Sequence, residues 1–165
     1  MEKYTLSVLV ENHAGVLSRV VGLFTRRGFN IHSLSVGTTK DEKISRITIE
    51  VKGDDYMLEQ VSKQLSKLME VIKLKKLTEG DMVKCGLILI KVKAAPKTRG
   101  EIIEVTNVFR ANIVDISETT LTVEMTGSDR KIDAFLRMME NYGIEEIART
   151  GMTALERGAN TLRLN

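Results

Sequence analysis

The stretch Val10-Glu11-Asn12-His13-Ala14-Gly15-Val16 carries the residue types that most directly suggest chemistry. Asn12 can form a turn or cap a helix, and Gly15 lets a ligand or a second backbone approach closely. A strand-like run, Tyr4–Val10, precedes this stretch, and apolar residues recur at helical spacing over Leu17–Phe24. A strand that enters a helix through such a turn leaves unpaired N–H groups and a partial positive charge, which favour a carboxylate or phosphate. An ordinary turn with an Asn cap fits the same residues and is commoner.

A second amide, Asn30, opens the next predicted strand, just after the helix that Gly15 begins. We therefore expect Asn12, Gly15 and Asn30 to converge at one end of the sheet. Two side-chain amides and free backbone N–H groups suit a zwitterion, with its carboxylate on the helix start and its ammonium on the amide oxygens. We expect a small aliphatic pocket beside them, built from Leu9, Val16, Leu17 and Ile31.

Catalytic constellations are missing from the sequence. His13 and His32 are the only histidines, and neither has a Ser, Cys or carboxylate partner at a motif spacing. Cys85 is the only cysteine, which excludes an internal disulfide and a Cys-rich metal site. No glycine-rich nucleotide-binding motif is present. The sequence therefore predicts no catalytic residue and no metal site, and it favours a binding module over an enzyme.

The composition indicates a globular chain without a strong charge bias. The 165 residues suffice for one sizeable domain or two small ones, and a hydrophobic content of 42% is ample for a core. With 25 basic and 22 acidic residues the net charge is +3, and neither sign dominates a long block. No run has the length of a membrane span, and no signal peptide is visible. We expect a cytoplasmic protein that binds neither nucleic acid nor membranes.

The apolar and polar patterns predict a β-α-β-β-α-β order that occurs twice, with a short polar boundary at Thr78–Asp81. The predicted elements of the first copy are Tyr4–Val10, Val16–Arg27, Phe29–Val36, Ile44–Val51, a helix capped by Asp54 or Asp55, and Val71–Leu77. Those of the second copy are Val83–Val92, Arg99–Phe109, Asn112–Ile116, Leu121–Met125, a helix capped by Ser128 or Asp129, and Ile144–Arg149. We expect an α+β chain of two tandem ferredoxin-like βαββαβ domains, 1–78 and 79–165.

The repeated order also predicts which faces and strands of the sheets are exposed. Arg27–Ile31 aligns with Phe109–Ile113, whereas the sequence assigns no structure to the tail 152–165. Each sheet has one face that its helices leave uncovered, and in the strand Ile44–Val51 the outward, solvent-facing residues are Arg46, Thr48 and Glu50. The exposed strands Ile44–Val51 and Ile31–Val36 invite pairing with a second copy, so we expect a homodimer with its seam near the Asn12–Gly15 turn.

Several longer runs of residues resemble those of a known protein family, and the resemblance covers nearly the whole chain. In the first half they are Glu11–Val20, Gly22–Ile31, Ser33–Val36, Ser45–Thr48, Leu58–Leu65 and Lys67-Leu68. In the second half they are Phe109–Asp115, Lys131–Phe135, Ala148–Gly151 and Arg157-Gly158. Together these runs resemble the small, regulatory subunits of acetolactate (acetohydroxyacid) synthase, whose N-terminal part is an ACT domain. ACT domains in general share only the Asn-x-x-Gly turn, so the extended runs are the more specific feature.

The resemblance implies a non-catalytic partner of a large catalytic subunit that condenses two 2-oxo acids in branched-chain amino acid (valine, isoleucine, leucine) synthesis. Thiamine diphosphate, Mg²⁺ and FAD are expected in that catalytic partner, and no cofactor is expected in this chain. By the same resemblance, domain 1–78 binds the feedback inhibitor valine at a dimer seam, and domain 79–165 stimulates the catalytic subunit. The implied effector contacts are Asn12, Gly15 and Asn30, flanked by Ala14, Val16, Leu17 and Ile31.

Two other functions remain open at this level. A stand-alone ACT-type amino-acid sensor would regulate another enzyme or transcription, although no helix-turn-helix region remains once both repeats are assigned. A small enzyme of ferredoxin-like fold is disfavoured by the missing catalytic constellation. Fold alone does not separate these functions, because many activities use it.

Overall fold

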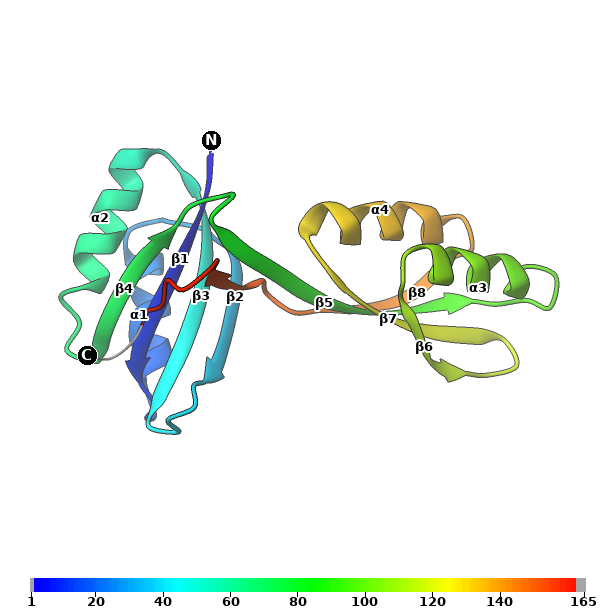
Figure 1. The fold of residues 1–165 in the computed structure, drawn as a ribbon, viewed down its shortest axis with the longest axis horizontal. Coiled ribbons are helices and arrows are strands. Elements are labelled where there is room, and N and C mark those ends of the chain that lie inside the picture. The colour runs from blue at the N-terminus through cyan, green and yellow to red at the C-terminus, as the bar shows by residue number, and fades with distance from the viewer. Residues whose placement is uncertain (1, 163–165) are drawn as a thin grey trace. The chain divides into compact units, whose positions relative to one another are not determined.

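The chain forms two compact α+β units, seen in a computed structural model that describes residues 2–162 (Figure 1). The first unit comprises the residues up to Val83 together with the segment from Gly151, and the second unit is Lys84–Thr150. The repeated β-α-β-β-α-β order predicted from the sequence is confirmed in both halves. The chain therefore has the expected fold class of two ferredoxin-like domains.

The first unit is a four-stranded antiparallel sheet in the order β2-β3-β1-β4, with two helices on one face. Its elements are β1 (Glu2–Glu11), α1 (Val16–Arg26), β2 (Ile31–Thr38), β3 (Ile44–Gly53), α2 (Asp55–Leu65) and β4 (Val71–Leu77). The apolar stripe of α1 (Val16, Val20, Leu23 and Phe24) packs against Leu6, Val8, Val10, Ile47 and Ile49 of the sheet. Asp54 begins α2 by accepting a hydrogen bond from the Met57 N–H at 2.8 Å, which selects it over Asp55 as the cap.

The second unit repeats this arrangement around its own core. Its sheet order is β6-β7-β5-β8, and Ser128 caps α4 by accepting from the Lys131 N–H. The elements are β5 (Met82–Lys93), α3 (Arg99–Val108), β6 (Asn112–Ile116), β7 (Thr120–Gly127), α4 (Asp129–Glu140) and β8 (Ile144–Arg149). Its core is built from aliphatic strand residues and from Ile102, Ile132, Phe135 and Met139 of the helices. Phe135 also contacts Phe109, with ring centroids 5.3 Å apart.

The helix-free face of the first sheet is buried, which corrects the prediction of a solvent-facing row in β3. Arg46 is half-buried, and Thr48 and Glu50 are 2% and 0% exposed. The segment after Gly151 covers this face, and it contains a strand that the sequence did not predict, β9 (Thr153–Glu156) (Figure 1). A small apolar cluster of Leu77, Met82 and Ala154 closes the contact.

Several polar contacts hold this C-terminal segment on the sheet. The Met152 N–H donates to Ser33 Oγ at 2.8 Å, and Ser35 Oγ lies 3.0 Å from Thr153 Oγ1. Lys75 and Glu156 form an ion pair at 2.8 Å. Residues 151–162 therefore belong to the first unit, whereas the predicted boundary placed everything after residue 78 in the second.

Both repeats end their first helix with a residue in the left-handed conformation. In the first unit this residue is Gly28, with φ of 69°, and in the second it is Arg110, with φ of 55°. The aligned runs Arg27–Ile31 and Phe109–Ile113 place these two residues at the same position. A non-glycine residue in this conformation is strained by its Cβ. The left-handed conformation therefore costs more free energy in the second repeat than in the first.

Gly28→Ala should destabilise the first unit by about 1 kcal/mol, because alanine is strained at this positive φ. Gly22→Ala is the matched control: Gly22 lies inside α1 with open space around it, so alanine there should stabilise by about 0.5–1 kcal/mol. Arg110→Gly should stabilise the second unit. Urea unfolding with amide hydrogen exchange measures all three variants, and equal effects of the two alanine variants would contradict the assignment.

Candidate ligand-binding site

The start of α1 offers backbone N–H groups to solvent. Gly15 occupies the N-cap position with φ of 89°, and no side chain within the described chain caps the helix. The Arg19 N–H already donates to the Gly15 carbonyl at 3.0 Å, whereas the Val16 N–H makes only a long contact of 3.4 Å to the His13 carbonyl. The N–H groups of the first turn have no partner inside the helix, and the residues from Asn12 to Gly15 are exposed. The geometry suits an anion.

Asn12 supports the turn rather than capping the helix. Its backbone N–H donates to the Lys43 carbonyl at 2.7 Å, and its side-chain Nδ2 donates to the Glu42 carbonyl at 2.7 Å. These two bonds tie the end of β1 to the loop that enters β3. This bond uses one of the two Nδ2 protons and fixes the orientation of the amide, and Oδ1 is the acceptor that Asn12 offers to a ligand.

Charged side chains surround the helix start. His13 Nε2 lies 3.0 Å from Glu11 Oε2, and His13 Nδ1 lies 3.2 Å from the Ala14 carbonyl oxygen. Arg19 Nη1 donates to the carboxylate of Glu70, whose side chain is largely buried. The hydrogen bond to the Ala14 carbonyl, followed by that to Glu11, raises the pKa of His13 above its ordinary value.

Asn30 does not lie beside Asn12 in one chain, which contradicts the predicted convergence. Ile31 pairs with Val51, and Val51 pairs with Tyr4 at the beginning of β1. Asn12 follows the other end of β1, so seven strand residues, or about 23 Å, separate the two levels. The reason is that α1 carries the chain back along the sheet before β2 begins. Asn30 and Ile31 lie at one end of the sheet, and Asn12 and Gly15 lie at the other.

The predicted aliphatic pocket is also divided. Val16 is 4% exposed and belongs to the core under α1, whereas Leu17 is 41% exposed. Leu9 pairs with Arg46 and therefore lies on the opposite, helix-free face of the sheet. Of the predicted contacts, the structure brings together Asn12, Ala14, Gly15 and Leu17 around the helix start.

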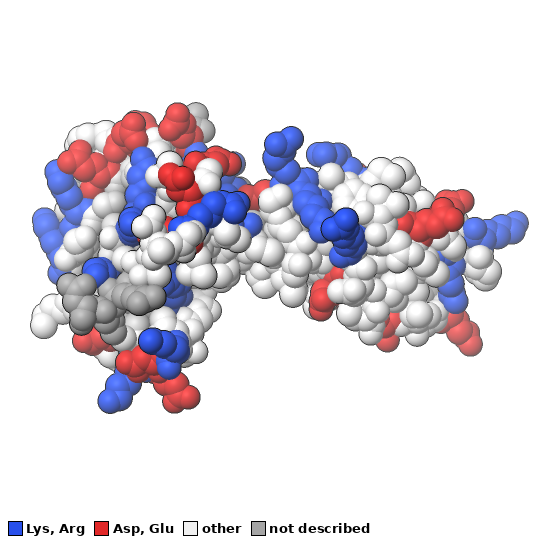
Figure 2. Space-filling view, in the orientation of Figure 1, with Lys and Arg blue, Asp and Glu red and all other residues white. Residues whose placement is uncertain are grey.

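The described residues bear on three other kinds of site: a metal centre, a membrane-spanning helix and a nucleic-acid surface. Between residues 2 and 162, no group of three or more His, Cys, Asp or Glu side chains is arranged to hold a metal ion. Over the same range, no helix has the length and apolar character to cross a membrane. On the face of the first unit shown in Figure 2, basic and acidic side chains are interspersed, without a continuous basic surface for nucleic acid.

Comparison with known proteins settles the family. Residues 6–73 match the AHAS small subunit-like ACT domain, and residues 86–158 match the family described as small subunit of acetolactate synthase. The probable acetolactate synthase small subunit of Archaeoglobus fulgidus is 56% identical over 94% of this chain and 98% of its own length. The chain belongs to the family of acetolactate synthase small subunits.

Other acetolactate synthase small subunits agree with this assignment. That of Mycolicibacterium smegmatis is 53% identical over 94% of this chain and 91% of its own length. The crystal structure of the small subunit from Thermotoga maritima superimposes with a TM-score of 0.91 at 38% identity, covering 97% of this chain and all of that one. The resemblance read from the sequence is therefore confirmed for both halves of the chain.

The pKa of His13 should exceed the ordinary 6.5 in the folded protein. Because this pKa is raised, the stabilisation from charged His13 is present below pH 6.5 and is lost as the pH rises through the folded value. Titration of the His13 ring protons by NMR measures this shift directly. Glu11→Gln should lower the pKa only in part, since the Ala14 carbonyl remains. An unshifted wild-type His13 would contradict the geometry.

Proposed function

We propose that this chain is the regulatory subunit of a cytoplasmic acetolactate synthase in branched-chain amino acid biosynthesis. It stimulates a large catalytic subunit and makes that subunit sensitive to feedback inhibition by valine. The observation that carries this proposal is the pair of family matches, an ACT domain at 6–73 and the small-subunit domain at 86–158. The second match also favours a subunit of this enzyme over a stand-alone ACT sensor.

In this proposal the chemistry belongs to the catalytic partner. Thiamine diphosphate, Mg²⁺ and FAD are held by the large subunit, where two 2-oxo acids are condensed. The small subunit contributes binding energy only: an effector that binds one arrangement of the complex better than another shifts their populations by that difference in affinity. A coupling of about 1–3 kcal/mol corresponds to a difference in affinity of about 5- to 150-fold between the two arrangements.

A homodimer that pairs through β2 would bring the two parts of the ligand site together. β2 is an edge strand, whereas β3 has neighbours on both sides, so β2 alone of the two strands first considered is available for pairing. If two copies of β2 pair antiparallel over their whole length about a two-fold axis, Ile31 of one copy lies opposite Thr38 of the other. Thr38 is level with Ser45, next to the end of β1. Pairing thus brings Asn30 and Ile31 of one copy beside Asn12 and Gly15 of its partner.

This arrangement gives valine a complete set of partners. The carboxylate binds the N–H groups at the start of α1, and the ammonium binds the side-chain oxygens of Asn12 and of Asn30 from the partner. Ala14, Leu17 and the partner copy's Ile31 flank the side chain. Discrimination among valine, leucine and isoleucine depends on the size of this space, because one methylene is worth about 1–3 kcal/mol.

Gly15→Asp should abolish valine inhibition and leave stimulation of the catalytic subunit intact. The new carboxylate lies where the effector carboxylate binds, so it repels the ligand. Assays of acetolactate formation by the reconstituted complex, with and without valine, measure both properties.

Gly15→Asn is the matched control for Gly15→Asp. Asparagine has nearly the same size without the charge, and it tolerates the positive φ of this position better than most residues. It should retain more inhibition than aspartate. Full valine inhibition in the aspartate variant would refute the site.

Mixed dimers test whether the site is shared between copies. Asn12→Ala and Asn30→Ala should each weaken valine binding by about tenfold or more. Because each site takes one asparagine from each copy, a heterodimer of the two variants has one doubly altered site and one intact site. Calorimetry should then show tight binding at half the sites. Failure of the mixture to restore any tight binding would contradict a shared site.

A further inference from the structure

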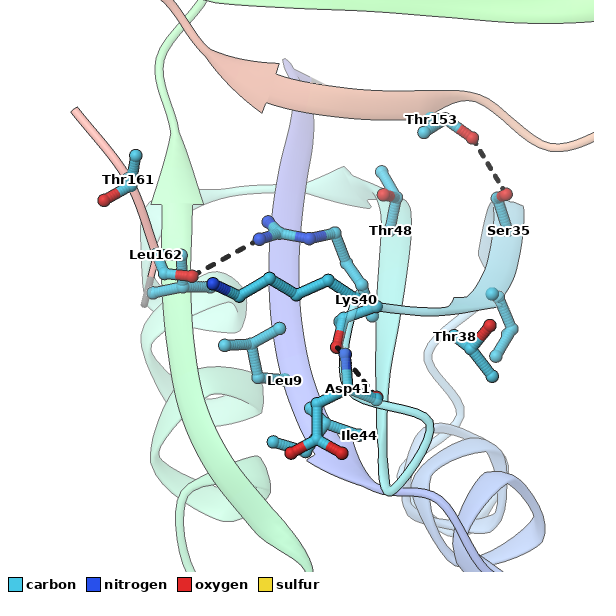
Figure 3. A pocket seen from close by; sticks show the side chains of 14 residues that line it. Leu9, Ser35, Thr38, Lys40, Asp41, Ile44, Thr48, Thr153, Thr161 and Leu162 are labelled. Atoms are coloured by element: carbon cyan, nitrogen blue, oxygen red, sulfur yellow. Dashed lines mark hydrogen bonds between the residues drawn. The ribbon is translucent and has the colours of Figure 1, made fainter. Parts of the chain in front are cut away.

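A second cavity lies on the helix-free face of the first sheet, formed entirely by the first unit (Figure 3). Its volume of about 710 Å³ is in the range of small-molecule sites. The β2–β3 hairpin forms one side, and the C-terminal segment forms the other with Thr153, Thr161 and Leu162. Neither Asn12 nor Gly15 lines it, so it is separate from the site at the start of α1.

Arg46 is a half-buried cation in this cavity, and no carboxylate of the described residues pairs with it. Its Nη1 donates to Ser7 Oγ at 2.8 Å, and its Nη2 donates to the Leu162 carbonyl at 3.4 Å. Both acceptors are neutral, and no carboxylate among residues 2–162 lies within ion-pair distance of Arg46. Burial lowers the pKa of its guanidinium, an effect that the more distant charge of Glu156 opposes. An anion in the cavity would supply the missing charge.

Lys40 adds a second positive charge at the rim. Its side chain extends toward Leu162, and no described residue forms an ion pair with it (Figure 3). Asp41 is the one acidic residue among the described lining residues, and its Oδ1 accepts from the Lys43 N–H at 2.9 Å. That bond holds the Asp41 carboxylate in the hairpin turn. The cavity therefore carries an excess of positive charge.

The rest of the lining is aliphatic or hydroxylated. Leu9 and Ile44 are 3% and 7% exposed and form an apolar floor. Ser35 and Thr153 satisfy each other, with their hydroxyl oxygens 3.0 Å apart. No aromatic side chain is present among the described lining residues, so nothing there would stack on a planar ring.

We propose that this cavity binds an aliphatic carboxylate. The carboxylate pairs with Arg46 and Lys40, and the hydrocarbon part covers Leu9 and Ile44. Pairing would compensate the desolvated guanidinium, and burial of the chain would remove apolar surface from water. Because Leu162 bonds to Arg46 and also lines the cavity, a bound carboxylate competes with the Leu162 carbonyl for the same guanidinium.

Titration of the full chain with octanoate, followed by calorimetry and by amide NMR shifts, tests this proposal. Octanoate should shift resonances of β2, β3 and 161–162, and octanamide, which has the same chain without the charge, should bind at least about tenfold more weakly. Arg46→Met, which keeps the aliphatic stem, should weaken octanoate binding by about tenfold or more.

Two further variants keep the test decisive if Arg46→Met fails to fold. Lys40→Met removes an exposed cation and should weaken octanoate binding by roughly threefold. Lys43→Met is its matched control on the same hairpin, outside the lining, and should leave binding unchanged. Gly15→Asp should also bind octanoate normally, which separates this cavity from the valine site. Equal binding of octanoate and octanamide, equal effects of the two lysine variants, or shifts confined to the start of α1 would overturn the proposal.

Discussion

The strand register of the first unit is the constraint on which its functional geometry depends. β1 pairs antiparallel with β3 from Glu2–Gly53 to Glu11–Ile44, and β2 pairs antiparallel with β3 from Ile31–Val51 onward. A slip of one residue would turn every side chain to the other face, so the alternation of apolar and polar residues along β1 and β3 fixes this register firmly. The register in turn fixes which loop residues share an end of the sheet. It separates the two asparagines in one chain, so the proposed valine site needs a second copy to bring them together.

The helix-free face of the same sheet is buried like the helix-covered face, but many of its residues are polar. Thr5, Ser7, Thr48 and Glu50 are nearly or fully buried there, although all are polar. Burial of such groups is costly unless they are paired, and Lys3 Nζ lies 3.4 Å from Glu50 Oε2. The C-terminal segment brings matching polar atoms, notably Ser35 against Thr153 and Lys75 against Glu156. This face is therefore a polar interior rather than a wet surface.

Local sequence signals were sufficient to predict the helices and strands. They were insufficient to predict which elements and loops lie next to one another. The caps Asp54 and Ser128 and the glycine after α1 depend on adjacent residues, and the structure confirms these three predictions. The solvent-facing row predicted for β3 was wrong, because that face is buried. The placement of Asn30 beside Asn12 was wrong because it ignored helix length, since eleven residues of α1 advance the chain by about 16 Å. β9 was missed because its partner, β5, lies far away in the sequence. Its four residues carry little periodicity of their own.

The return of the chain to the first unit after Gly151 makes the second unit an insertion with two covalent attachments. A protease that cuts once in the exposed turn at Glu79–Gly80 would therefore not release a free regulatory domain. The N-terminal fragment would stay bound to the remainder through the sheet contacts of Met152, Thr153 and Glu156. The nicked protein would migrate as one particle under native conditions and separate only in denaturant. The first unit would therefore stay folded even if the chain were cut at this turn.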